Sequence, residues 1–172
     1  GLNTHVYYFR CRTKDNAGNI SDYADAGDTH TTIDSIAPVA ATVRDGSSSD
    51  VDYSTDGASL SANWDQTDYA ISYSYAIGTT PGSGNVVGWT DTTSTSFTKS
   101  GLTLASGQTY YVSVKGKNHA GTEGSAGVSN GVMVDTTAPT TPLVYVPAAY
   151  TSSTNTLSGS WSSEDPDSGI AE

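Results

Sequence analysis

Residues 110–121 read YYVSVKGKNHAG, and residues 7–18 carry a related stretch, YYFRCRTKDNAG. Two further pairs of segments match in the same order: 34–38 with 135–139, and 60–64 with 157–161. The three offsets are 103, 101 and 97 residues. Collinear matches at a nearly constant offset indicate an internal repeat. We therefore infer a repeating unit of about 100 residues, the usual size of one β-sandwich domain.

The repeat divides the chain at its two Ala-Pro pairs, because proline cannot occupy a central strand and often marks a boundary. On this division residues 37–136 form one complete unit. Residues 1–36 are then the C-terminal part of a preceding unit, and residues 137–172 are the N-terminal part of the next. Two strands alone are marginally stable in water, so we expect each end piece to pack against further sequence or a neighbouring copy.

Apolar and polar residues alternate through the complete unit, which is the period of a β-strand and not of a helix. The expected strands are 39–44, 59–64, 70–77, 87–90, 95–99, 110–117 and 131–135. Short strands separated by turn residues are typical of a sandwich, so the sequence predicts an all-β, immunoglobulin-like fold. The residues expected in its core are Leu60, Trp64, Ile71, Tyr73, Tyr110, Val112 and Val114.

Several parts of the sequence resemble the fibronectin type III domains of large exported bacterial and archaeal proteins. The resemblance lies in Trp64, Tyr73, the 110–121 stretch and the linker 134–139, and it covers all 172 residues. It implies tandem sandwiches in an extracellular or cell-surface protein. In such sandwiches a tyrosine near the start of one strand bonds through its hydroxyl to nearby backbone, which is the role expected of Tyr110. No Arg-Gly-Asp tripeptide occurs, so the resemblance gives no support to integrin binding.

The composition narrows the classes of function. Eighteen acidic and seven basic residues give a net charge of −11. Nucleic acids and anionic membranes both attract basic surfaces, so we expect no nucleic acid as a partner. No apolar stretch approaches the roughly 20 residues that cross a bilayer, so we expect no membrane insertion in this segment. The chain has no Cys/His cluster of the zinc type, and its serines and threonines are too abundant for any one of them to stand out as a nucleophile. We therefore expect no enzyme activity and no required cofactor.

Alternation along the 110–117 strand directs its basic side chains to the outer face of the sheet, and the 7–14 stretch repeats this pattern. The candidate contact residues are Trp89, Tyr8, Tyr111, Arg10, Arg12, Lys115 and Lys117. The basic residues are compatible with ordinary solubility patterning or with docking of neighbouring copies, basic sheet against acidic loop. An exposed row of Trp89, Tyr8 and Tyr111 would instead favour surface glycans, and buried aromatic side chains would favour a scaffold.

Acidic residues gather in the loop 45–57 and around the second linker. Calcium takes several carboxylate and carbonyl oxygens as ligands, so a junction between two units could hold calcium. The candidate ligands are Asp135, Asp165, Asp167 and Asp52. Ordinary solvated surface charge is the alternative, and the spacing does not match an EF-hand loop. A separate motif, Asn19-Ile20-Ser21, is an N-glycosylation sequon and makes Asn19 a candidate modification site.

We expect this chain to be a non-catalytic structural module of an extended extracellular or cell-surface fibre, stalk or sheath. Threonine and proline restrict the Asp-Thr-Thr-Ala-Pro linker at 135–139, which favours a semi-rigid rod over a flexible chain of units. The expected partners are copies of itself or adjacent repeats. The alternative is an adhesin, or a carbohydrate-binding or spacer module of a secreted glycan-degrading enzyme.

Overall fold

The computed structural model describes residues 4–24 and 29–171. Within these residues the chain forms strands and no helix, so the all-β prediction is confirmed and no described segment is a helix that could span a bilayer. The strands are β1 (Thr4–Tyr8), β2 (His30–Asp34), β3 (Val43–Asp45), β4 (Tyr53–Ser54), β5 (Ser59–Trp64), β6 (Ser72–Gly78), β7 (Val87–Thr92), β8 (Ser96–Ser100), β9 (Gln108–Lys117), β10 (Gly127–Val128), β11 (Val132–Val134), β12 (Leu143–Tyr145) and β13 (Ser160–Ser162).

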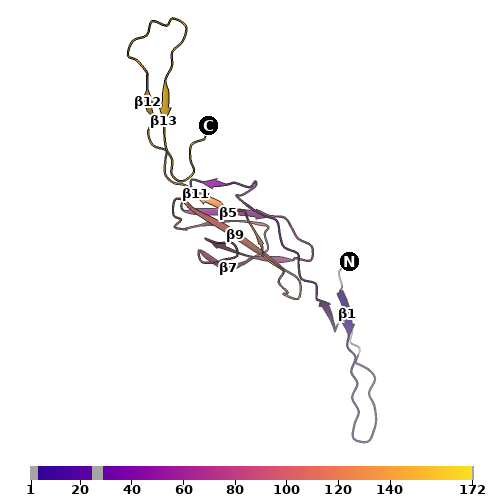
Figure 1. Ribbon diagram of the computed structural model, residues 1–172. Helices are drawn as coiled ribbons and strands as arrows, with labels where there is room; N and C mark the ends of the chain where they lie inside the picture. Colours follow the sequence, from indigo (N-terminus) through magenta and orange to yellow (C-terminus); the bar gives the residue numbers. More distant parts are fainter. Residues whose placement is uncertain (1–3, 25–28, 172) are drawn as a thin grey trace.

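Strands β3 to β11 form two packed sheets, which we call the central sandwich (Figure 1). One sheet has the order β3-β5-β8, and the other has the order β4-β11-β9-β6-β7, with β10 paired to β9. Neighbouring strands are antiparallel except for β4 and β11, which are parallel. The fold is therefore an immunoglobulin-like sandwich, in which β7 extends the sheet of β6 and β9.

The core lies between the inner faces of β5 and of the β6–β9 pair. Along β5 every second residue is buried, from Leu60 to Trp64. The Trp64 ring meets the ring of Tyr73 from the opposite sheet edge to face, with 5.6 Å between centroids. Tyr110, Val112 and Val114 of β9 are buried in the same core. Burying an apolar side chain of this size stabilises the fold by about 1.5–3 kcal/mol.

The prediction that Ile71 lies in the core is wrong, since its side chain is 50% exposed. Strand β6 begins only at Ser72, and the buried place at this end of the sheet is taken by Ala70. Ala70 packs directly over Gly116 of β9, where a side chain of any size would collide with it. Within β6 the alternate residues Tyr73, Tyr75 and Ile77 do belong to the core, although Ser74 and Ala76 between them are buried as well.

Strand bounds differ from the sequence prediction mainly at the first strand. The expected strand 39–44 is regular only in β3, because residues 38–41 run beside Gly124 and Gly127 without forming a ladder. Two short strands, β4 and β10, were not predicted. The Tyr110 hydroxyl accepts a hydrogen bond from the backbone N–H of Ala105 at 2.8 Å, which is the role expected of it.

Two hairpins, β1–β2 and β12–β13, project from opposite ends of the central sandwich (Figure 1). Their strands pair in the register of equivalent strands within the sandwich. Tyr7 lies opposite Thr31 in the first hairpin, as Tyr110 lies opposite Val132 in the sandwich. The same holds for the last hairpin: Val144 faces Trp161, and Val43 faces Trp64. The apolar side chains that these hairpins expose include Val6, Tyr7, Ile33, Leu143, Val144 and Trp161.

Candidate functional site: the two linker junctions

The first linker, residues 34–38, is held by the loop that follows β9. The side-chain amide of Asn118 donates to the backbone carbonyls of Asp34 at 3.0 Å and Ile36 at 2.9 Å. The backbone N–H of His119 donates to the Asp34 carboxylate at 3.2 Å. Asn118 is 2% exposed and Asp34 is 9% exposed, so these bonds are largely shielded from water. Each such bond contributes about 0.5–1.5 kcal/mol.

The second linker, residues 135–139, is held by the opposite end of the sandwich. The Ser106 hydroxyl accepts a hydrogen bond from the Thr136 backbone N–H at 3.0 Å, and donates to the Asp167 carboxylate at 2.7 Å. The Thr137 hydroxyl lies 2.9 Å from an oxygen of Asp135 and 2.7 Å from an oxygen of Asp167. One loop beyond β13 is thereby joined to the linker and to the loop before β9.

The carboxylate of Asp135 is kept ionised by its neighbours. Hydrogen bonds from the Ser168 hydroxyl and from the Thr137 backbone N–H lower the pKa of Asp135 below its usual value. Hydrogen bonds to the charged form favour that form over the neutral acid. At neutral pH Asp135 therefore accepts donors from the segment that follows it, as Asp34 accepts the His119 N–H in the first linker.

The four candidate calcium ligands are only partly brought together. Asp135 and Asp167 share the Thr137 hydroxyl between them. Asp165 accepts the backbone N–H groups of Asp167 and Ser168, both at 3.0 Å, and so shapes its own loop. Asp52 lies apart, with the Asn130 amide 3.4 Å from its carboxylate. Among the described residues no three His, Cys, Asp or Glu side chains are grouped closely enough to hold a metal ion, so calcium binding stays a prediction.

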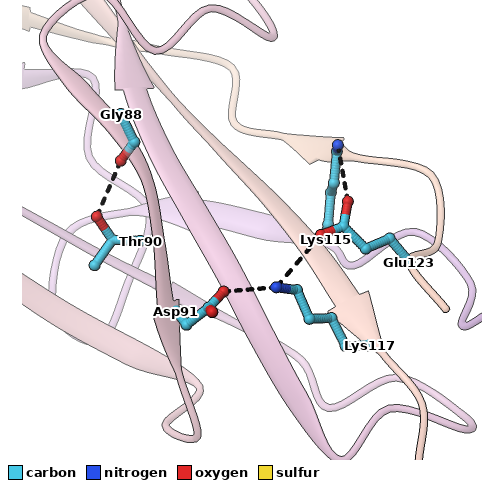
Figure 2. A network of polar contacts seen from close by, with 6 residues as sticks. All are labelled: Gly88, Thr90, Asp91, Lys115, Lys117 and Glu123. Carbon is cyan, nitrogen blue, oxygen red and sulfur yellow. Dashed lines mark hydrogen bonds and ion pairs between the residues drawn. The ribbon is translucent and has the colours of Figure 1, made fainter. Parts of the chain in front are cut away.

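The outer face of the β6–β9–β7 sheet carries a network of ion pairs (Figure 2). Lys117 lies 2.7 Å from Asp91 and 3.4 Å from Glu123, and Lys115 lies 3.2 Å from Glu123. These pairs lower the pKa of Glu123, chiefly through the hydrogen bond from Lys115, and raise the pKa of Lys117, chiefly through Asp91. In β7 itself, the Thr90 hydroxyl donates to the Gly88 carbonyl at 2.9 Å. The two lysines are thus matched by acids of their own sheet.

The three candidate aromatic residues do not form one row. Trp89 in β7 is 43% exposed, and the Lys115 ammonium lies 4.5 Å above its ring. Such a cation–π contact places a positive charge over one face of the ring. Tyr111 is partly buried in β9, close to Gly131. Tyr8 belongs to β1, in a separate sheet.

The candidate residues of the first hairpin lie on exposed loop backbone. β1 ends at Tyr8, so Arg10 and Arg12 follow the strand and do not extend its outer face. The Arg12 guanidinium lies 5.1 Å from the centre of the Tyr23 ring. Asn19 is exposed, as expected for the sequon, and its side-chain amide donates to Asp15 at 2.8 Å.

Asp45, which was expected among the acidic residues of the loop 45–57, is instead a buried carboxylate at the end of β3. It is fully buried, and it accepts the Gly131 backbone N–H at 2.9 Å, which ties the β3 sheet to β11. Its other oxygen, Oδ1, has no hydrogen bond of standard geometry. Burial raises the pKa of Asp45 to about 6. The sequence feature that could have indicated its burial is its position two residues after Val43, on the inward side of the strand.

Asn118 and Ser106 were also missed as functional residues. Asn118 lies inside the repeated stretch, but its bonding partners at residues 34 and 36 are more than 80 positions away in the sequence. Ser106 is one of 25 serines and carries no motif of its own. Contacts of this kind become visible only once the fold has brought the linkers to the loops.

No protein-family model and no curated protein matches this chain. The solved structures that are similar in fold include the following two. One is the twitchin kinase region from C. elegans (Fn31-NL-kin-CRD-Ig26), at 13% identity and a TM-score of 0.41, covering 59% of this chain and 17% of that one. The other is an Fn3-like protein from Clostridium thermocellum, at 24% identity and a TM-score of 0.35, covering 57% of this chain and 88% of that one.

The fold is fibronectin type III-like. Its strand order decides this assignment, with β3-β5-β8 in one sheet and β7 joined to β6 in the other. The Tyr110 hydroxyl bond to the preceding loop agrees with it. A fold of this kind hosts many functions, so any function must be argued from the junctions and surfaces described above.

Proposed function

We propose that this chain is a non-catalytic structural module, one stretch of an array of fibronectin type III-like repeats in an extended fibre, stalk or sheath. The observation that carries the proposal is the anchoring of both linkers. Asn118 and His119 bind the first linker, and Ser106 binds the second. When hydrogen bonds fix a linker to the end of a sandwich, the orientation of the next unit is fixed relative to that sandwich. A flexible Gly/Ser-type linker would leave that orientation free.

The arrangement of the chain supports an extended array. The two hairpins leave from opposite ends of the central sandwich, so successive units would follow one another and not fold back (Figure 1). The registers of β1–β2 and β12–β13 reproduce those of β9–β11 and β3–β5, which supports the division into units at residues 1–36, 37–136 and 137–172. We therefore propose that the partners of this unit are the adjacent repeats of the same chain.

The outer face of β9 is better suited to a spacer than to a surface on which the acidic loops of a neighbouring copy dock. Lys115 and Lys117 are engaged by Glu123 and Asp91 on the same sheet. Exposed ion pairs of this kind contribute about 0–1 kcal/mol each and leave little charge to attract a partner. We therefore assign the basic residues of β9 to solubility and not to contacts between copies. An extracellular or cell-surface location is proposed from the sequence resemblance alone.

Imaging of the intact parent protein tests this proposal. Negatively stained particles should be extended, with a regular row of small globular units. Compact particles, in which a large enzyme domain dominates, would contradict the proposal and favour the spacer of a secreted glycan-degrading enzyme.

The second candidate function is carbohydrate binding, and the exposure of Trp89 favours it. Its side chain is 43% exposed although the Lys115 ammonium lies over the ring. Titration with soluble β-1,4-linked glucose and N-acetylglucosamine oligosaccharides, followed by tryptophan fluorescence, tests this function. We expect no saturable change. A saturable change that is lost in Trp89→Ala but kept in Tyr8→Ala would establish a sugar site and overturn the purely structural assignment.

A further inference from the structure

Asn118 uses both halves of its side chain, and each half serves a different purpose. The amide oxygen accepts the backbone N–H groups of Ala120 at 3.0 Å and Thr122 at 2.8 Å, which shapes the loop after β9. The amide nitrogen donates both of its hydrogens to the first linker, at Asp34 and Ile36. An asparagine amide offers two donors and one acceptor oxygen, so the side chain is fully used at this position.

The loop after β1 has the same shape but a different residue at its centre. Asp15 stands where the repeat places Asn118, and it accepts the backbone N–H groups of Ala17 at 2.9 Å and Asn19 at 2.8 Å. The backbone bonds agree as well: the Asp15 N–H donates to the Asn19 carbonyl at 2.9 Å, as the Asn118 N–H donates to the Thr122 carbonyl at 3.1 Å.

The two loops differ in what they offer to a linker. The second oxygen of Asp15 accepts the side-chain amide of Asn19 at 2.8 Å. An ionised carboxylate has no hydrogen to donate, and hydrogen bonds from Asn19 lower the pKa of Asp15 below its usual value. Asp15 therefore shapes its loop as Asn118 does, but it cannot bind a pair of backbone carbonyls.

We propose that the residue at this loop position decides whether a sandwich binds the linker that enters it. With asparagine, the loop forms a docking surface for the preceding repeat of the same chain. The segment it fits has two backbone carbonyls two residues apart, and a carboxylate on the first of those residues to accept the next backbone N–H, as Asp34 does for His119. With aspartate, the loop keeps its shape and the joint lacks this attachment. This inference rests on the proposed function and names the contact that stiffens one type of joint.

The variant Asn118→Asp separates the two purposes, because the carboxylate still accepts the N–H groups of Ala120 and Thr122, as Asp15 does in its own loop. Spin labels at Thr32→Cys in β2 and Lys99→Cys in β8, with Cys11 replaced by serine, report the distance across the first linker. We expect a narrow distance distribution for the parent pair, and a distribution at least about twice as broad for Asn118→Asp. Asn155→Asp adds the same charge in an exposed loop and should leave the width unchanged.

The outcomes distinguish this inference from the proposed function. A narrow distribution that stays narrow in Asn118→Asp overturns the inference and leaves the stiff spacer intact. A distribution that is already broad in the parent chain contradicts the stiff spacer itself. Should Asn118→Asp fail to fold, amide exchange in the unmodified chain decides: the Asn118 side-chain hydrogens should exchange at least about tenfold more slowly than those of Asn155. Equal exchange rates would overturn the inference.

Discussion

The buried carboxylate of Asp45 should make the stability of the central sandwich depend on pH. The side chain is fully buried, and only one of its oxygens accepts a hydrogen bond of standard geometry, from Gly131. Burial disfavours the charged form, and the nearby carboxylates of Asp50 and Asp52 add to this effect, so that the pKa is raised from 3.8 to about 6. Folding therefore takes up a proton between these two pH values.

The sign of the effect follows from the raised pKa. Because the folded chain holds this proton more tightly than the unfolded chain, the stabilisation is complete below about pH 4 and is lost as the pH rises through about 6. A shift of this size corresponds to a change of at most about 3 kcal/mol in the free energy of unfolding. Carboxylates with lowered pKa values, such as Asp65 and Asp135, act in the opposite direction and only in more acidic solution.

Urea unfolding of the chain and of Asp45→Asn, at several values between about pH 4.5 and 7.5, measures this contribution. Asparagine keeps an acceptor for the Gly131 N–H and cannot ionise. We expect the free energy of unfolding of the parent chain to fall across this range by about 2 kcal/mol more than that of the variant. Contributions from the rest of the chain are common to both proteins and cancel in the difference. If the free energy of unfolding depended on pH in the same way in both proteins, burial would not raise the pKa of Asp45.

Three further outcomes are expected. Trp64→Ala should cost about 3–5 kcal/mol in urea unfolding, because it leaves a cavity beside Tyr73; a cost below about 1 kcal/mol would place Trp64 outside the core. Tyr110→Phe removes the acceptor of the Ala105 N–H and should cost about 1 kcal/mol by the same assay, whereas no loss would show that water replaces the hydroxyl. Calcium bound between Asp135 and Asp167 should raise the melting temperature above its value in chelator, and Asp167→Asn should abolish the rise; equal melting temperatures in calcium and in chelator would contradict the calcium site.

The sequence was most informative where local patterns control structure. Alternation in residues 59–64 predicted the buried face of β5, and the same period identified the inner face of β9. The position of Tyr110 predicted its hydroxyl bond to the preceding loop, which is confirmed. These features depend on neighbouring residues and on the pleat of a strand, so that they can be deduced before the fold is known. Ile71 failed because the alternation was extended past the end of the strand.

The candidate site could not be derived in the same way. The bonds from Asn118 to the first linker, and from Ser106 to the second, join residues that only the packed sandwich brings together. Ser113 shows the same limitation on the outer face: alternation directs it outward, but the loop after β6 folds back, and Gly82 donates its N–H to the Ser113 hydroxyl at 3.1 Å. The sequence predicted that threonine and proline restrict the second linker, and it did not reveal the side chains that hold either linker.

Both linkers should have a fixed orientation relative to the central sandwich. Residual dipolar couplings of backbone amides measure this orientation directly in the 172-residue chain. An alignment tensor fitted to β5, β6 and β9 alone should reproduce the couplings of residues 32–36 and of residues 135–137 without adjustment. Couplings in either linker that fit only after the tensor is reduced by about half or more would show independent motion. That result would contradict a stiff, extended array.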